Sequence, residues 1–172
     1  MLRVITLITL LLLLNCLAVP AQSQTPGTIL FQKSYENYAW EATFSGILVD
    51  SDGKVFSFNF PAEALGPKPV IVKPETAADL KAYYARYTRL LKTVDAAELA
   101  QMVALIPEVA AASSGPLLDN ARDAGQKLWL AYQVDNDTGV FKTIKLREDG
   151  DSVQESLSPK AVTLINWLNG LK

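Results

Sequence analysis

Alternation of apolar and polar residues predicts a β-hairpin in the first half of the chain. Within residues 54–60, three phenylalanines are separated by single polar residues, which is the period of a strand with one buried face. The preceding segment 50–53, Asp-Ser-Asp-Gly, has the composition of a tight turn. The strand before this turn is expected over 38–49, and its apolar positions change parity at Gly46, which predicts a bulge or bend.

The same alternation returns in the last third of the chain and predicts a second hairpin. Residues 127–134 and 140–146 each alternate apolar with other side chains, and Asp135 to Gly139 form the turn between them. A proline-rich loop after the first hairpin leaves room for a short edge strand at 70–72. The two hairpins and this strand predict an antiparallel sheet of about five strands.

Helical spacing of apolar residues dominates the middle of the chain. Thr76 and Asp79 have the spacing of a capping box, which marks a helix start. The residues that follow place one apolar stripe on a helical wheel: Leu80, Tyr83, Tyr84, Tyr87, Leu90, Leu91 and Val94. We therefore expect a single helix to run from Thr76 to about Val94, with this stripe in the core.

Two further helices are predicted from capping residues. Asp95 and Glu98 repeat the capping pattern before an apolar face that Pro107 disturbs. Ser158 and Pro159 open a last helix, which Gly170 is placed to end. Its buried face is expected to comprise Ala161, Leu164, Ile165 and Leu168. The order of strands, helices, strands and helix predicts an α+β fold with the helices packed on one face of the sheet.

Four cations lie opposite the apolar stripe of the first predicted helix, and we take them as the candidate binding residues. They are Lys81, Arg86, Arg89 and Lys92. On one helical face they would present a local positive charge, suited to an acidic protein or an anionic component of the cell envelope. The alternative is a solvated helix flank whose late cations complement the helix dipole.

The N-terminal segment 1–21 has the pattern of a secretory signal peptide. Arg3 precedes an apolar run, and small residues before Ala21 suit cleavage there. The mature chain would then have a polar leader at 22–27 and one α+β domain at 28–172. A lipid anchor on Cys16 is the less favoured alternative, because Asn15 stands where a small residue would be expected.

Composition excludes several classes of chemistry. The chain has no histidine, and its single cysteine lies within the predicted signal peptide. The mature protein would therefore lack a Ser-His-Asp or Cys-His catalytic centre, a His or Cys zinc site, a His-ligated haem and any disulfide. We predict neither a metal nor a cofactor.

Sixteen basic residues against 18 acidic residues give no bulk attraction to nucleic acid. No stretch after the signal is apolar over the roughly 20 residues that a membrane helix needs.

Two short motifs match reactive or metal-binding patterns only in spacing. Ser51 and Lys54 have the spacing of an S-x-x-K nucleophile motif, but they lie in a predicted turn without the helix that this motif uses. The acidic turn at 135–139 resembles the start of a calcium-binding loop, yet glycine occupies the wrong place and Leu146 stands at the twelfth position. Both are expected to be ordinary turns.

Carboxylates are the remaining route to catalysis. Glu36 and Glu41 lie close in sequence to Tyr35, Tyr38 and Trp40, and aromatic rings commonly line sugar sites. A pair of carboxylates can hydrolyse a glycosidic bond without histidine.

Because the mature chain would lack histidine and cysteine, the sequence predicts an exported, periplasmic or secreted interaction domain without enzymatic activity. The alternative is a small carboxylate-dependent hydrolase that acts on cell-wall glycan.

Overall fold

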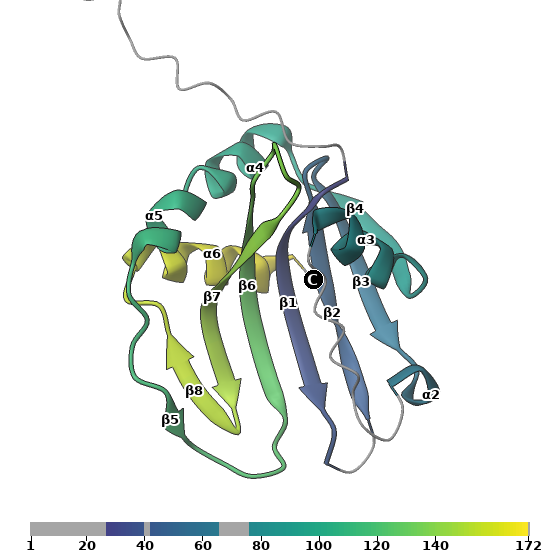
Figure 1. Ribbon diagram of the computed structural model, residues 1–172, viewed down its shortest axis with the longest axis vertical. Coiled ribbons are helices and arrows are strands. Elements are labelled where there is room, and N and C mark those ends of the chain that lie inside the picture. The colour runs from purple at the N-terminus through teal and green to yellow at the C-terminus, as the bar shows by residue number, and fades with distance from the viewer. Residues whose placement is uncertain (1–26, 40–41, 66–75, 172) are drawn as a thin grey trace, which may run out of the picture.

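A computed structural model describes residues 27–39, 42–65 and 76–171, whose strands form one antiparallel sheet of eight strands (Figure 1). The strands are β1 (Ile29–Asn37), β2 (Thr43–Asp50), β3 (Lys54–Phe60), β4 (Thr88–Thr93), β5 (Leu118–Asp119), β6 (Gln126–Val134), β7 (Phe141–Gly150) and β8 (Ser152–Glu155). The helices are α2 (Ala62–Leu65), α3 (Ala77–Ala85), α4 (Ala96–Val103), α5 (Ile106–Ala111) and α6 (Pro159–Gly170). The order across the sheet is β4-β3-β2-β1-β6-β7-β8-β5.

Both predicted hairpins are present, as β2–β3 and β6–β7, and β1 joins them. The expected total of about five strands is wrong, because β1, β4, β5 and β8 lack a clean alternation. In β1, for example, Leu30 is an extra residue: Ile29 pairs with Asp50 and Phe31 with Val49. This bulge places apolar residues side by side and hides the period of the strand.

The bulge expected at Gly46 is also wrong. Strand β2 begins at Thr43, and its pairing with β1 and with β3 continues through Gly46 without a shift. A Cβ atom at this position would lie 2.1 Å from the Lys33 carbonyl oxygen and 2.8 Å from Ser34 Cα. Glycine is therefore required because the β1 backbone passes very close to β2.

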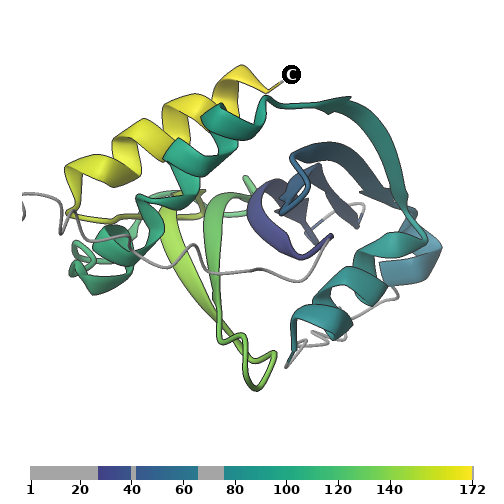
Figure 2. The same cartoon turned by 90° about the horizontal axis from the view of Figure 1, so that it is seen from above.

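Helices cover both faces of the sheet, which corrects the expectation of one covered face (Figure 2). The α6 face, defined by Val49, Val55 and Trp129, packs against α4, α5 and α6. The α3 face, defined by Leu48, Phe58 and Tyr132, packs against α2 and α3. Neighbouring residues of β2 point to opposite sides, and both sides are buried. This explains the change of parity that the sequence showed along this strand.

The helix expected from Thr76 to Val94 ends early. Thr76 caps α3 through the predicted capping box, but the helix stops at Ala85 and the chain returns as β4 alongside β3. The other predicted helix starts are confirmed: Asp95 accepts hydrogen bonds at the start of α4, and Ser158 caps α6. All four residues of the predicted α6 face are buried: Ala161, Leu164, Ile165 and Leu168.

Several predictions concern residues outside the described ranges. These are the signal peptide at 1–21, most of the leader at 22–27, the edge strand at 70–72, and the residues Cys16, Trp40 and Glu41. Among the helices that are described, none is both long and apolar enough to cross a membrane.

Candidate functional site

The four predicted binding cations do not share a helical face. Lys81 lies on α3 and Arg86 is the C-cap residue of that helix, whereas Arg89 and Lys92 lie on β4. The placement of all four on one helix is therefore wrong, because the helix ends before Arg89. All four side chains are exposed.

Lys81 is directed to the turn between β2 and β3. Its Nζ atom lies only 2.4 Å from where a Cβ atom on Gly27 would be. The pKa of Asp52 in this turn is lowered, first by the hydrogen bond from Lys54 and to a smaller extent by the positive charge of Lys81. Lys81 is thus part of a local acidic and basic turn and is not grouped with the cations of β4.

Arg89 and Lys92, in contrast, lie on the same face of the sheet because of a bulge in β4. Arg89 pairs with Ser57 and Lys92 pairs with Val55, so Leu91 is an extra residue. Directly paired residues project to the same side, and Val55 packs on the α6 face. In a regular strand, residues 89 and 92 would project to opposite sides. Neither cation forms an ion pair with any residue in the described ranges.

A second group of charged residues lies on the α3 face, where β1, β6 and β7 run side by side. Glu36 pairs with Gln126, and Glu148 pairs with Leu128 two positions further along the same strand. The pKa of Glu36 is raised, mainly by burial and then by the negative charge of Glu148. The two carboxylates are therefore close enough to affect each other.

Glu148 is held by a local hydrogen-bond network. Its carboxylate accepts hydrogen bonds from Lys145 Nζ and from Ser152 Oγ. Burial by itself would raise the pKa of Glu148, but these hydrogen bonds and the charge of Lys145 outweigh burial and lower it. The pKa values of the two carboxyl groups are thus shifted in opposite directions, as in an acid and base pair.

A hollow of about 280 Å³ lies beside Glu36. Its lining residues are Glu36, Asn37, Tyr38, Ala39, Asp123, Gly125, Gln126 and Asp151. Glu148 is not among them, and Asp151 accepts a hydrogen bond from the Ala124 backbone N–H at 2.8 Å. The hollow is therefore lined by Glu36, whose pKa is raised, but not by Glu148, whose pKa is lowered.

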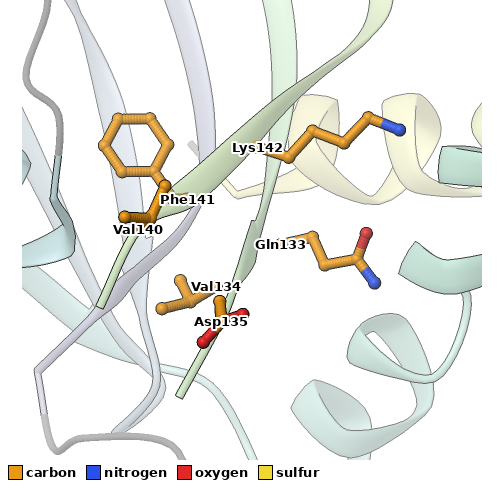
Figure 3. Close-up of a pocket in the computed structure, with 6 residues that line it drawn as sticks. All are labelled: Gln133, Val134, Asp135, Val140, Phe141 and Lys142. Carbon is orange, nitrogen blue, oxygen red and sulfur yellow. The ribbon is translucent and has the colours of Figure 1, made fainter. Parts of the chain in front are cut away.

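A larger hollow of about 380 Å³ lies at the end of the β6–β7 hairpin (Figure 3). Phe141 and Val140 point to one side of the hairpin, whereas Lys142 and Gln133 point to the other. Lys142 Nζ donates to the Ala110 carbonyl oxygen of α5 at 3.2 Å, and the Phe141 ring packs on Tyr132. These side chains do not converge on a common point, so the hollow has no set of groups that could hold a ligand.

The two short motifs have structural roles in their turns. Ser51 Oγ accepts a hydrogen bond from the Thr28 N–H at 3.1 Å, and Lys54 Nζ pairs with Asp52 at 3.0 Å. The pKa of the Asp135 carboxyl group is lowered, first by hydrogen bonds from Thr138 and then by the hydrogen bond from the Asp137 N–H. Within the described ranges, no three Asp, Glu, Cys or His side chains are grouped as metal ligands would be.

The feature that sequence reasoning missed is the bulge at Leu91. In the sequence alone, residues 88–93 do not alternate as a strand does, and they continue the apolar stripe of the predicted helix; only the pairing of β4 with β3 shows that they form a strand.

Comparisons with protein-family models, with curated proteins and with solved structures give no match.

Proposed function

We propose that this protein is an exported, periplasmic or secreted, interaction domain without enzymatic activity that binds an acidic protein through β4. The observation that carries the proposal is the pair Arg89 and Lys92, two exposed cations on one face of a strand at the end of the sheet. Complementary charge steers partners and selects among them. Export rests on the N-terminal segment 1–21, whose sequence has the pattern of a signal peptide.

Exposed leucines favour an acidic protein over a purely ionic ligand such as a lipid headgroup. Leu90 and Leu91 in the same strand are 53% and 40% exposed, and apolar contacts of this kind suit a polypeptide partner. Arg86 lies just before β4 and adds positive charge to the approach of such a partner. Lys81 contributes less, since it lies beside Gly27 and its charge acts on Asp52 of the β2–β3 turn.

Charge reversal tests the proposal. The double variant R89E/K92E should bind labelled polyglutamate at least about tenfold more weakly than the wild type in fluorescence anisotropy at physiological salt. A matched control is R122E/K160E, which makes the same change in net charge with two exposed residues away from β4. Equal loss in both variants, or no binding by the wild type, would overturn the proposal. Binding to anionic vesicles without binding to polyglutamate would also overturn it.

Export is tested separately by cell fractionation. A C-terminally tagged chain should be recovered outside the cytoplasm, with a mature N-terminus at Gln22 by mass spectrometry. Recovery of the full-length chain from the cytosol would contradict export, while leaving the binding test unaffected.

A second candidate function is hydrolysis of cell-wall glycan, favoured by the pair Glu36 and Glu148. Burial raises the pKa of Glu36, whereas the hydrogen bonds from Lys145 and Ser152 lower the pKa of Glu148, so the two pKa values are shifted apart in the way that the acid and the base of a glycosidase are. A zymogram with peptidoglycan tests this function. Clearance by the wild type that is lost in E36Q would support it, and absence of clearance by the wild type would contradict it.

A further inference from the structure

We propose that the acidic partner binds as an added β-strand along the free edge of β4, with acidic residues on one face and apolar residues on the other. This inference rests on the proposed function and specifies how the partner is recognised. In strand addition, the backbone of an extended peptide pairs with the edge of a sheet, and the alternating side chains give specificity.

β4 is the edge that offers a long enough backbone. It has six residues and lies at one end of the sheet, and no described strand lies beyond it (Figure 1). A strand in this position has one row of N–H and C=O groups outside the sheet. The opposite edge, β5, has only two residues. Typical strands have five or six residues, so β4 matches an added strand and β5 does not.

The two faces of β4 have different chemistry, which defines the partner. Arg89 and Lys92 project on the α6 face, as their pairing with Ser57 and Val55 shows. Leu90 pairs with Phe56 and therefore projects on the α3 face, where it is 53% exposed. Directly opposite side chains on neighbouring strands lie close together, and unlike charges stabilise such pairs. The matching strand therefore alternates acidic and apolar residues.

A second copy of this chain fits the edge poorly. The sequence of β4, Thr-Arg-Leu-Leu-Lys-Thr, is nearly symmetric when it is reversed. Symmetric antiparallel pairing of two copies would thus place Arg89 of one chain opposite Lys92 of the other. Like charges directly opposite each other destabilise a strand pair. The positive charge of β4 therefore disfavours pairing with β4 of a second copy and favours pairing with an acidic strand.

Edge cations and bulges also protect strands from aggregation, and this is the main alternative. Protection alone does not account for the exposed leucines, because a protected edge is served best by polar side chains. Leu90 and Leu91 both remain accessible on β4. The combination of cations on one face with an accessible leucine on the other suits selective pairing more than simple exclusion.

Peptides with a modified backbone test strand addition directly. The probe is a capped peptide of alternating Glu and Val, about six residues long, the usual length of a strand. Two derivatives carry N-methyl groups on alternate amides, one set on the Glu residues and the other on the Val residues. Only one set of amides faces β4 in an added strand, so methylation of that set should weaken binding at least about tenfold while methylation of the other set has little effect.

The outcomes separate this inference from the proposed function. If both methylated peptides bind as well as the parent and R89E/K92E still abolishes binding, strand addition is wrong and the acidic-partner proposal stands. If the parent peptide does not bind the wild type, while polyglutamate does, strand addition is again wrong. If neither ligand binds, both proposals fail and β4 is a protected edge. A scrambled peptide with its Glu residues in one block is the composition control and should bind more weakly.

Discussion

Tyr84 and Tyr132 donate hydrogen bonds to the same oxygen atom, Oε1 of Gln32, at 2.9 and 2.7 Å. Tyr84 lies on α3 and Tyr132 on β6, while Gln32 lies on the central strand β1 and is 3% exposed. The Gln32 amide nitrogen in turn donates to Ser34 Oγ at 3.0 Å. This buried amide therefore connects the helix to both halves of the sheet.

Replacement of Gln32 should be costly because it leaves two buried hydroxyl groups without their acceptor. We expect Q32L to lower the free energy of unfolding by about 2 to 6 kcal/mol, since each of the two unsatisfied buried groups costs about 1 to 3 kcal/mol. Y132F should cost only about 1 kcal/mol, because Gln32 then still accepts from Tyr84. Urea denaturation measures both. A Q32L variant as stable as the wild type would show that the network adds nothing to stability.

A second prediction concerns the close approach of β1 to β2 at Gly46. G46A should destabilise the fold by about 2 kcal/mol or more, since its Cβ atom would overlap the Lys33 carbonyl oxygen and the β1 backbone must move. The control is G170A at the end of α6, where nothing lies within 4 Å of an added Cβ atom. That variant should be unchanged or slightly more stable, because alanine favours helix. Thermal melts of both variants measure the difference. Equal stability of G46A and the wild type would contradict the close approach.

The raised pKa of Glu36 predicts how stability depends on pH. Because folding raises this pKa above its usual value of 4.5, the folded state favours the protonated carboxyl group. Stability from this group is therefore present below pH 4.5 and is lost as the pH rises through the folded-state pKa. E36Q should accordingly melt at a higher temperature than the wild type near neutral pH. The difference should close as the pH falls to about 4.

The control for this measurement is E108Q on α5, an exposed residue. Its difference from the wild type should change less with pH than that of E36Q. A constant difference between E36Q and the wild type across this pH range would show that the burial of Glu36 does not favour its protonated form.

The capping box of α3 gives a fourth prediction. Thr76 Oγ1 accepts from the Asp79 N–H at 3.2 Å, and Asp79 Oδ2 accepts from the Thr76 N–H at 3.2 Å. T76A should cost about 1 kcal/mol of stability, the usual loss for an N-cap residue. T163A, in the exposed middle of α6, is the control and should be neutral or slightly more stable, because alanine favours helix. If both variants lose the same stability in urea, the cap does not hold the helix.

Sequence patterns failed where a bulge disturbs the period of a strand. Leu91 is an extra residue in β4, so the order of apolar and polar residues over 88–93 fits a helix as well as a strand. Pairing with β3 decides between them, because the edge of β3 offers hydrogen bonds to a strand but not to a helix. Because residues 88–93 pair with β3, Arg89 and Lys92 lie on a strand, away from the helix that carries Lys81. The bulge at Leu91 then places Arg89 and Lys92 on the same face.

Local sequence determined the turns and the helix starts, because their causes lie within a few residues. The Asp50 carboxylate accepts the N–H groups of Asp52 and Lys54, and Ser158 caps α6, whatever the rest of the chain does. Tertiary structure alone decided that β1 lies between the two hairpins and that helices cover both faces. It also decided that β4 lies at one end of the sheet that the described strands form. These features depend on contacts between distant segments, and side-chain patterns along one strand do not specify its neighbours.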